Sequence, residues 1–134
     1  MDEEFSTLDF AKYRLERAKE DLQAAQLLHN NNCLLAANNR AYYAIFRAIR
    51  AVLALERVDF KRHKDVIGYF NQHYIKSEIF PRMIGRKVSQ AQKIREDSDY
   101  DDEYQPSYEK TEQQIITAKE LIQLVEQYIN KQDK

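Results

Sequence analysis

Two arginines seven residues apart are the clearest sign of chemistry in this chain. Arg40 and Arg47 lie within N-N-R-A-Y-Y-A-I-F-R-A-I-R at positions 38–50. Positions seven apart differ by about 20° around a helix, so the two side chains are expected to share one face. Guanidinium groups bind carboxylates and phosphates strongly. The expected face consists of Arg40, Ala44, Arg47 and Ala51, flanked by Tyr43.

Two interpretations of this face follow from its chemistry. Alanines between the arginines would let another backbone approach, as a two-fold dimer contact or a cleft requires. Alternatively, the arginines extend to water or pair with acids on neighbouring helices.

Charge is distributed unevenly along the chain. The net charge is −1, but residues 40–64 carry seven basic and two acidic side chains, a net +5. Residues 79–95 add five basic and no acidic side chains, and residues 96–112 have a net charge of −7. If the basic segments meet, they form a patch that could hold phosphates. The alternatives are solvated helix faces, or an acidic loop that folds over the patch and neutralises it.

Composition indicates one all-α domain over residues 1–134. Only 2 Gly and 2 Pro are present, which favours helices joined by short loops over β-hairpins. The single cysteine, Cys33, cannot form an internal disulfide and fits a reducing cytoplasm. The sequence shows no signal peptide, membrane-span pattern or metal-ligand spacing, so we expect a cytoplasmic protein without a cofactor.

Apolar spacing predicts the helices of an antiparallel four- to five-helix bundle. The first runs from about Leu8 to His29 with Thr7 as its N-cap, and the second, central one from about Leu34 to Arg57. Residues 58–62 form a loop. The later helices are expected over His63–Ile75, Glu78–Arg95 capped by Ser77, and Ser107 to about Ile129, with an acidic loop over 98–107. Leu35, Ile79 and Met83 are among the residues expected to face inward.

Three motifs resemble the HEPN family, in particular its small stand-alone prokaryotic members. Those proteins have a helix reading roughly S-R-A-Y-Y-A-x-F-H-A, then K-T-H, then R-x-x-A-D-Y before the last helix. This chain has N-R-A-Y-Y-A-I-F-R-A at 39–48, K-R-H at 61–63 and R-E-D-S-D-Y at 95–100. Order and approximate spacing match over nearly the whole chain. The first motif is fairly specific, whereas K-R-H alone would carry no information.

The resemblance implies an up-and-down bundle that forms a homodimer around a cleft. In many members an Arg-x4–6-His motif cuts RNA without a metal, with the His as acid/base and the Arg on the phosphate. Such members often act as toxins in toxin–antitoxin or phage-defence systems, beside a small nucleotidyltransferase partner. Other members are non-catalytic and bind nucleotides or partner proteins.

One departure from the motif decides the functional expectation. Arg40 matches the family's arginine, but Arg47 stands where the histidine is expected. Arginine is always protonated near pH 7, so it is a poor proton shuttle and a good phosphate ligand. His63 could replace the histidine if its helix starts near the cleft, although a lone His there is more often a surface or capping residue. Tyr43 and Tyr100 could stack a base or pack at the bundle edge.

Three hypotheses remain open on the sequence. The first is a non-catalytic or weakly active HEPN homodimer whose basic cleft binds nucleotide, RNA phosphate or a partner protein. The second is a metal-independent ribonuclease toxin that uses Arg40 with His63. The third is a structural protein whose arginines pair with acids and bind nothing. The expected phosphate-binding residues are Arg40, Arg47, Tyr43, Tyr100 and Arg95.

Overall fold

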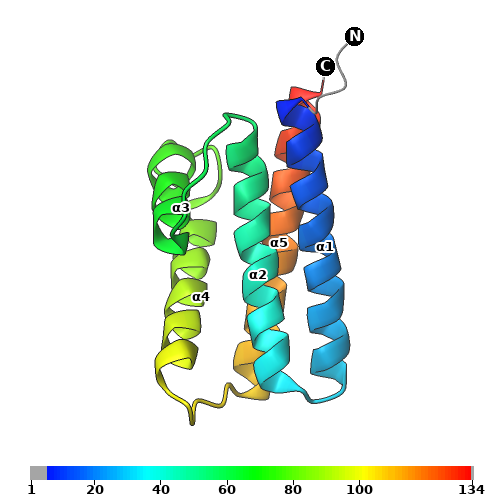
Figure 1. The fold of residues 1–134 in the computed structure, drawn as a ribbon, viewed down its shortest axis with the longest axis vertical. Helices are drawn as coiled ribbons and strands as arrows, with labels where there is room; N and C mark the ends of the chain where they lie inside the picture. The colour runs from blue at the N-terminus through cyan, green and yellow to red at the C-terminus, as the bar shows by residue number, and fades with distance from the viewer. Residues whose placement is uncertain (1–5, 134) are drawn as a thin grey trace.

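The computed structural model describes residues 6–133, and within them the predicted all-α antiparallel bundle is confirmed. The three longest helices lie side by side, with α4 next to α2 and α3 beside the upper part of α4 (Figure 1). The start of α1 and the end of α5 lie at the same end of the bundle. The elements are α1 (Thr7–Asn30), α2 (Leu34–Ala54), α3 (His63–Phe70), the π-helix η1 (Asn71–Ile75), α4 (Arg82–Tyr100) and α5 (Tyr108–Gln132).

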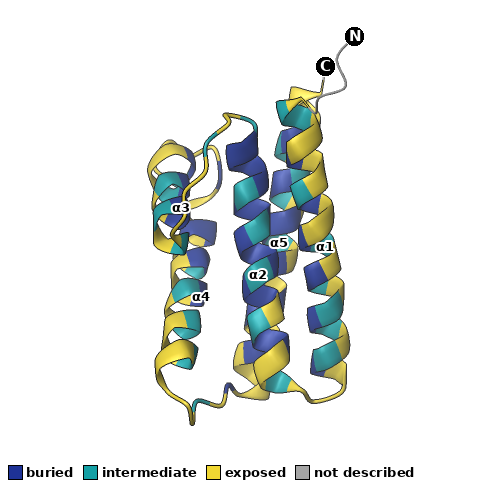
Figure 2. Ribbon diagram, viewed as in Figure 1, coloured by how far each residue is buried: buried dark blue, intermediate teal, exposed yellow. Residues whose placement is uncertain are grey.

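Helix α2 lies at the centre of the core, as predicted. It packs against α1, α5, α3 and α4. Its C-terminal half is buried on nearly all sides, whereas the other helices bury one stripe and expose the rest (Figure 2). Tyr42, Ile45, Ile49, Val52 and Leu53 are each at most 2% exposed. The partly exposed side chains of α2, among them Arg40, Tyr43 and Arg47, therefore extend from a helix whose other faces are fixed by the core.

Serine caps begin the first and last helices. The Ser6 side chain accepts a hydrogen bond from the backbone of Asp9 at 3.0 Å, and the Asp9 side chain accepts one from the Ser6 backbone at 3.2 Å. This reciprocal capping box satisfies two backbone donors that a bare helix end leaves free. The prediction of Thr7 as the cap was therefore wrong by one residue. Ser107 caps α5 as predicted, accepting from the Lys110 backbone at 3.0 Å.

Left-handed residues set two boundaries that periodicity did not reveal. Helix α2 ends at Ala54 because Arg57 takes a φ of 58°, and the Val58 backbone N–H closes back onto the Leu53 carbonyl at 3.1 Å. The expected end at Arg57 was three residues too far.

The start of α4 also differs from the prediction. Ser77 donates to the His73 carbonyl at 2.8 Å and does not cap a helix, and Glu78 takes a φ of 64°. The chain therefore turns before Pro81, which becomes the N-cap, and α4 runs from Arg82 to Tyr100. Because α4 continues to Tyr100 instead of ending at Arg95, the acidic loop is shorter than the predicted 98–107.

Three residues expected to face inward are exposed. Leu35 is 37% exposed, Ile79 47% and Met83 57%. Ile79 precedes the helix, and the buried stripe of α4 runs through Ile84, Val88 and Ala91, so Met83 falls beside it.

Two glycines should respond oppositely to alanine. A Cβ on Gly85 of α4 would lie 2.8 Å from Cγ2 of Ile75, whereas one on Gly68 of α3 meets nothing within 4 Å. We expect Gly85→Ala to lower the free energy of unfolding by about 1–3 kcal/mol through overpacking. Gly68→Ala should raise it by up to about 1 kcal/mol, because alanine favours helix. Urea denaturation of both variants checks this pair, and equal effects would contradict the close contact of α4 with η1.

Candidate functional site

A buried aspartate holds the two motif arginines. Asp21 of α1 is 5% exposed and falls between Ala18 and Ala25 on the buried stripe of that helix. Its two carboxylate oxygens accept from Nη1 of Arg40 at 2.9 Å and Nη1 of Arg47 at 2.7 Å. One carboxylate thus fixes both guanidinium groups across the α1–α2 contact.

The alanines of the same line are not available to an outside backbone. Ala44 and Ala51 are fully buried in the core of this chain. The Arg40 and Arg47 side chains remain 44% and 32% exposed. Within one chain the arginines therefore pair with an acid on a neighbouring helix, and their side chains remain partly exposed.

Three arginine side chains lie close to the ring of Tyr43. The guanidinium carbons of Arg40 and Arg47 lie 5.9 Å from its centroid, and that of Arg95 lies at 5.6 Å. Arg95 of α4 also donates from Nη2 to the Tyr43 hydroxyl at 3.3 Å and pairs with Asp99 one turn along. We call Asp21, Arg40, Tyr43, Arg47 and Arg95 the Tyr43 cluster. Four of the predicted site residues thus meet, although Arg40 and Arg95 lie 55 positions apart in the sequence.

His63 begins α3 close to this cluster. Its ring stacks on Phe46 at 3.9 Å and meets Tyr43 edge-on at 6.0 Å. Its Nδ1 lies 3.1 Å from the hydroxyl of Tyr42. His63 is therefore half-buried in an aromatic setting, with one ring nitrogen engaged.

The protonation states at His63 favour a neutral imidazole. Burial lowers the pKa of His63, and the positive charges of Arg95 and Arg50 lower it further. Burial also raises the pKa of Tyr42 to about 12, so this phenol keeps its proton near neutral pH. A neutral imidazole can accept a proton. The arginines whose charges lower this pKa are Arg95 and Arg50.

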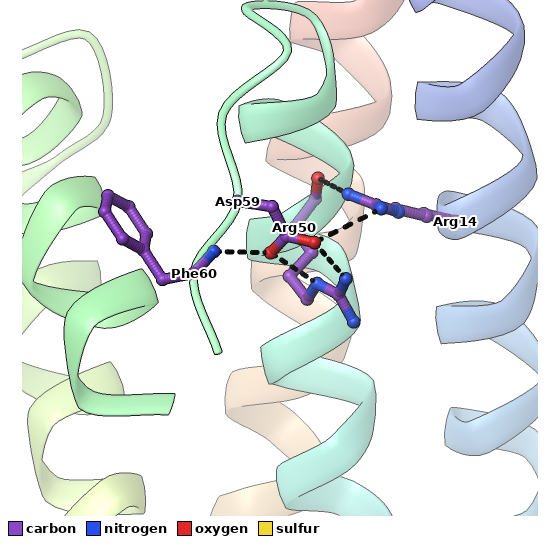
Figure 3. Close-up of polar contacts among 4 residues, drawn as sticks. All are labelled: Arg14, Arg50, Asp59 and Phe60. Atoms are coloured by element: carbon purple, nitrogen blue, oxygen red, sulfur yellow. Dashed lines mark hydrogen bonds and ion pairs between the residues drawn. The ribbon is translucent and has the colours of Figure 1, made fainter. Parts of the chain in front are cut away.

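A second aspartate between two arginines, Asp59, lies in the loop that joins α2 to α3. Arg50 of α2 forms a two-pronged ion pair with Asp59, and Nη2 of Arg14 from α1 approaches the same carboxylate at 3.5 Å (Figure 3). The Phe60 backbone N–H donates to Asp59 at 2.9 Å. Burial raises the pKa of Asp59, but these hydrogen bonds and charges outweigh it and the pKa is lowered. Asp59 therefore stays ionised and anchors the loop before α3.

A pocket of about 450 Å³ opens beside His63. Its lining consists of Phe46, Arg50, Asp59, Phe60, Lys61 and His63. It combines aromatic rings with basic side chains, and two of its residues come from the K-R-H motif.

Tyr100 stands apart from the other predicted site residues. It is the last residue of α4 and is 89% exposed. Within residues 6–133 it has no hydrogen-bond, ion-pair or ring partner. The acids near it pair locally on α4, Asp97 with Lys93 at 3.9 Å and Asp99 with Arg95.

Sequence reasoning missed Asp21, Arg50 and Asp59. Only Asp21 left a signal, because it puts a charge three residues after Ala18 and four before Ala25, inside an apolar stripe. A charge at such a position is costly unless it is paired, so it predicts a buried partner.

Residues 6–133 contain neither a cluster of metal ligands nor a membrane-spanning helix. No group of three or more His, Cys, Asp or Glu side chains there is placed to hold a metal ion. No helix among these residues is both long and apolar enough to cross a membrane.

Comparison with known proteins decides the family. The HEPN domain model matches residues 11–128. The chain belongs to the HEPN family. A Methanocaldococcus jannaschii protein named "putative toxin" is 32% identical over 78% of this chain and 77% of its own length. A UPF0332 protein of Thermotoga maritima is 29% identical over 88% and 89% of the two chains, and one of Gloeobacter violaceus is 33% identical over 64% and 68%.

Proposed function

We propose that this HEPN protein binds RNA through the Tyr43 cluster and cleaves it slowly or not at all. The observation that carries the proposal is the pairing of Arg40 and Arg47 with the single carboxylate of Asp21. This pairing orients two guanidinium groups in advance and leaves one positive charge uncompensated.

Preorganisation is what makes these arginines suitable ligands. A free arginine loses side-chain entropy when it binds, whereas one already held by Asp21 loses less. Each guanidinium has five N–H donors, and the bond to Asp21 uses one nitrogen of each group. The remaining donors can form the forked hydrogen bonds that phosphate oxygens accept. Tyr43 between them offers a ring face on which a base could stack.

The same geometry argues against efficient catalysis at this point. General acid–base catalysis needs a group whose pKa lies near the working pH. Arg47 occupies the motif position at which the family resemblance expects histidine, and it cannot release its proton. The cluster therefore supplies phosphate binding without proton transfer.

His63 supports a second candidate, a metal-independent ribonuclease. Its lowered pKa and its contact with Tyr42 describe a positioned neutral imidazole, 6.0 Å from the Tyr43 ring. In this version His63 accepts the proton of the ribose 2′-hydroxyl, and Arg40 and Arg95 hold the phosphate.

Assembly and biological role extend the proposal. We place the protein in a cytoplasmic homodimer in which two Tyr43 clusters form one basic cleft. We further propose a toxin-like role with a small nucleotidyltransferase as partner protein. The relatives named as toxins and the resemblance to toxin–antitoxin members support this role.

Fluorescence anisotropy with a labelled, 5′-hydroxyl RNA octamer tests the binding. We expect Arg40→Ala and Arg47→Ala each to weaken the affinity about tenfold, because each removes a charged hydrogen bond. Each should also make binding less dependent on salt. Arg82→Ala is the matched control, since Arg82 is an exposed arginine of α4 whose partner is Glu78 one turn away.

Three results would decide between the hypotheses. Equal affinity for the wild type and all three variants would show that the cluster does not bind RNA, and would favour a purely structural role for the arginines. Cleavage of the octamer by the wild type, lost in His63→Gln, would make the ribonuclease the correct reading. If the protein sediments as a monomer at all concentrations, the proposed homodimer is wrong.

A further inference from the structure

The last turn of α4 places an acid on the Tyr43 cluster. Arg95 donates from Nη1 to Asp99, which lies one turn further along α4, and from Nη2 to the Tyr43 hydroxyl at 3.3 Å. Both terminal nitrogens of this guanidinium therefore already have a partner. The Arg95 side chain is also 23% exposed, compared with 44% for Arg40 and 32% for Arg47. Of the three arginines around Tyr43, Arg95 is thus the least available to a phosphate.

The Asp99 carboxylate can leave its arginine, whereas the Asp21 carboxylate cannot. Only 6% of the Asp21 side chain is exposed, so it would stay buried and unpaired if Arg40 and Arg47 left it. The Asp99 side chain is 52% exposed and can turn into water. An exposed ion pair between residues four apart on a helix adds little stability. A phosphate can therefore replace Asp99 on Arg95 at a small cost to the fold.

The charge of Asp99 reaches the aromatic side chains next to the cluster. Burial and the arginine charges lower the pKa of His63, and the charge of Asp99 opposes this effect. Asp99 also contributes, after burial, to the raised pKa of Tyr42. Its negative charge thus acts on the surroundings that an RNA phosphate would enter, and two negative charges there repel each other.

The segment of α4 that carries Asp99 is not anchored in the core. The buried residues of α4 end at Ala91, and no residue from Gln92 to Tyr100 is buried (Figure 2). Ile94 and Asp97 line a cavity of about 500 Å³ between this segment and α5. Gln114 of α5 lines the same cavity and is 4% exposed, and within residues 6–133 its Nε2 has no hydrogen-bond partner. The last turns of α4 can therefore shift with Asp99 without giving up a buried side chain of their own.

We propose that Asp99 is an autoinhibitory contact, which occupies Arg95 in place of an RNA phosphate and is displaced when RNA binds. The inference rests on the proposed RNA binding and adds a control on it. A small anion on Arg95 alone would only exchange one negative group for another. An RNA chain also gains contacts with Arg40 and Arg47, and these offset the loss of the Asp99 pair.

Asp99→Asn tests the contact in the anisotropy assay with the 5′-hydroxyl RNA octamer. We expect binding to strengthen about fivefold, because the competitor for Arg95 and a negative charge beside the phosphate are both removed. Asp97→Asn is the matched control, since Asp97 is also 52% exposed but pairs with Lys93, four residues away. It should change the affinity by at most about twofold, because its charge is exposed and screened. Equal gains in the two variants would overturn the inference, and so would weaker binding by Asp99→Asn, which would make Asp99 a positioning residue for Arg95.

A double-mutant cycle shows whether the gain depends on Arg95. In an Arg95→Gln background, Asp99→Asn should change the affinity no more than Asp97→Asn does, because the guanidinium for which Asp99 competes is gone. A gain of about fivefold that persists in this background would mean that Asp99 acts by general repulsion, and the proposed competition would be wrong.

Carboxyl-carbon NMR follows the displacement in the wild-type protein. Addition of the octamer should shift the side-chain signal of Asp99, as this group exchanges Arg95 for water, and leave the signal of Asp97 in place. An unchanged Asp99 signal at saturation with RNA would show that the ion pair persists in the complex, against the inference. Failure of the proposed RNA binding is distinct, since it appears as insensitivity of the octamer affinity to Arg47→Ala.

Discussion

Asp21→Asn is expected to lower stability and tighten RNA binding at the same time. Asp21 is the buried anion between two arginines, and an amide keeps its shape without its charge. The free energy of unfolding should fall by about 1–3 kcal/mol, less than for a fully buried ion pair because both arginines are partly exposed. The net charge of the cluster rises by one, and we expect this gain to outweigh the partial loss of preorganisation and to strengthen RNA binding about fivefold at low salt.

Opposite changes in stability and affinity separate the two roles of the arginines. If they served only to join α1 to α2, Asp21→Asn would lower stability and leave RNA affinity unchanged. Glu20→Gln is the matched control, because it removes the same charge from the adjacent, exposed position on α1. Urea denaturation and anisotropy on the three proteins measure both quantities. A gain in affinity of equal size in Glu20→Gln would show that net charge alone is responsible.

Arg47→His is expected to raise the rate of RNA cleavage. The imidazole would stand where the family resemblance expects a histidine, on the face of α2 that carries Tyr43 and turns toward Asp21. An adjacent carboxylate orients an imidazole and favours its protonated form, which suits it as a general acid. General acid–base catalysis is typically worth about 10²–10⁴-fold, so we expect a gain of that order over the wild type.

Further substitutions show whether such a gain has the expected origin. Arg47→Gln should not cleave, because an amide cannot transfer the proton. Adding Arg40→Ala to Arg47→His should remove the gained activity, since the phosphate then lacks its ligand. Activity equal to wild type in Arg47→His, in a folded protein that still binds RNA, would contradict the view of the cluster as a nuclease site lacking its acid–base group.

The fold could be predicted from the sequence because its apolar stripes are regular. Ala11, Leu15, Ala18 and Ala25 recur at helical spacing, and all are buried in α1. The errors fell at helix ends, where single residues decide. Arg57 and Glu78 adopt left-handed conformations that could not be predicted from the sequence around them. As a result, α2 ends before the predicted residue and α4 begins after it.

The site was only partly predictable because its contacts join distant segments. Spacing alone placed Arg40 and Arg47 on one face, but their partner Asp21 comes from another helix. The meeting of Arg95 with Tyr43 depends on how α4 packs beside α2. Tyr100, predicted with them, lies one turn and a residue beyond Arg95 and points to solvent. The sequence was enough to predict what each side chain could bind, but the structure was needed to show which side chains lie together.

Arginine side-chain NMR during titration with the 5′-hydroxyl RNA octamer tests the central claim most directly. The account predicts that the Nε–H signals of Arg40, Arg47 and Arg95 shift together and saturate with the affinity measured by anisotropy. The signals of Arg82 and Arg86, exposed on α4, should stay in place. Shifts confined to Arg82 and Arg86, or no shift at the Tyr43 cluster while RNA binds, would contradict the account.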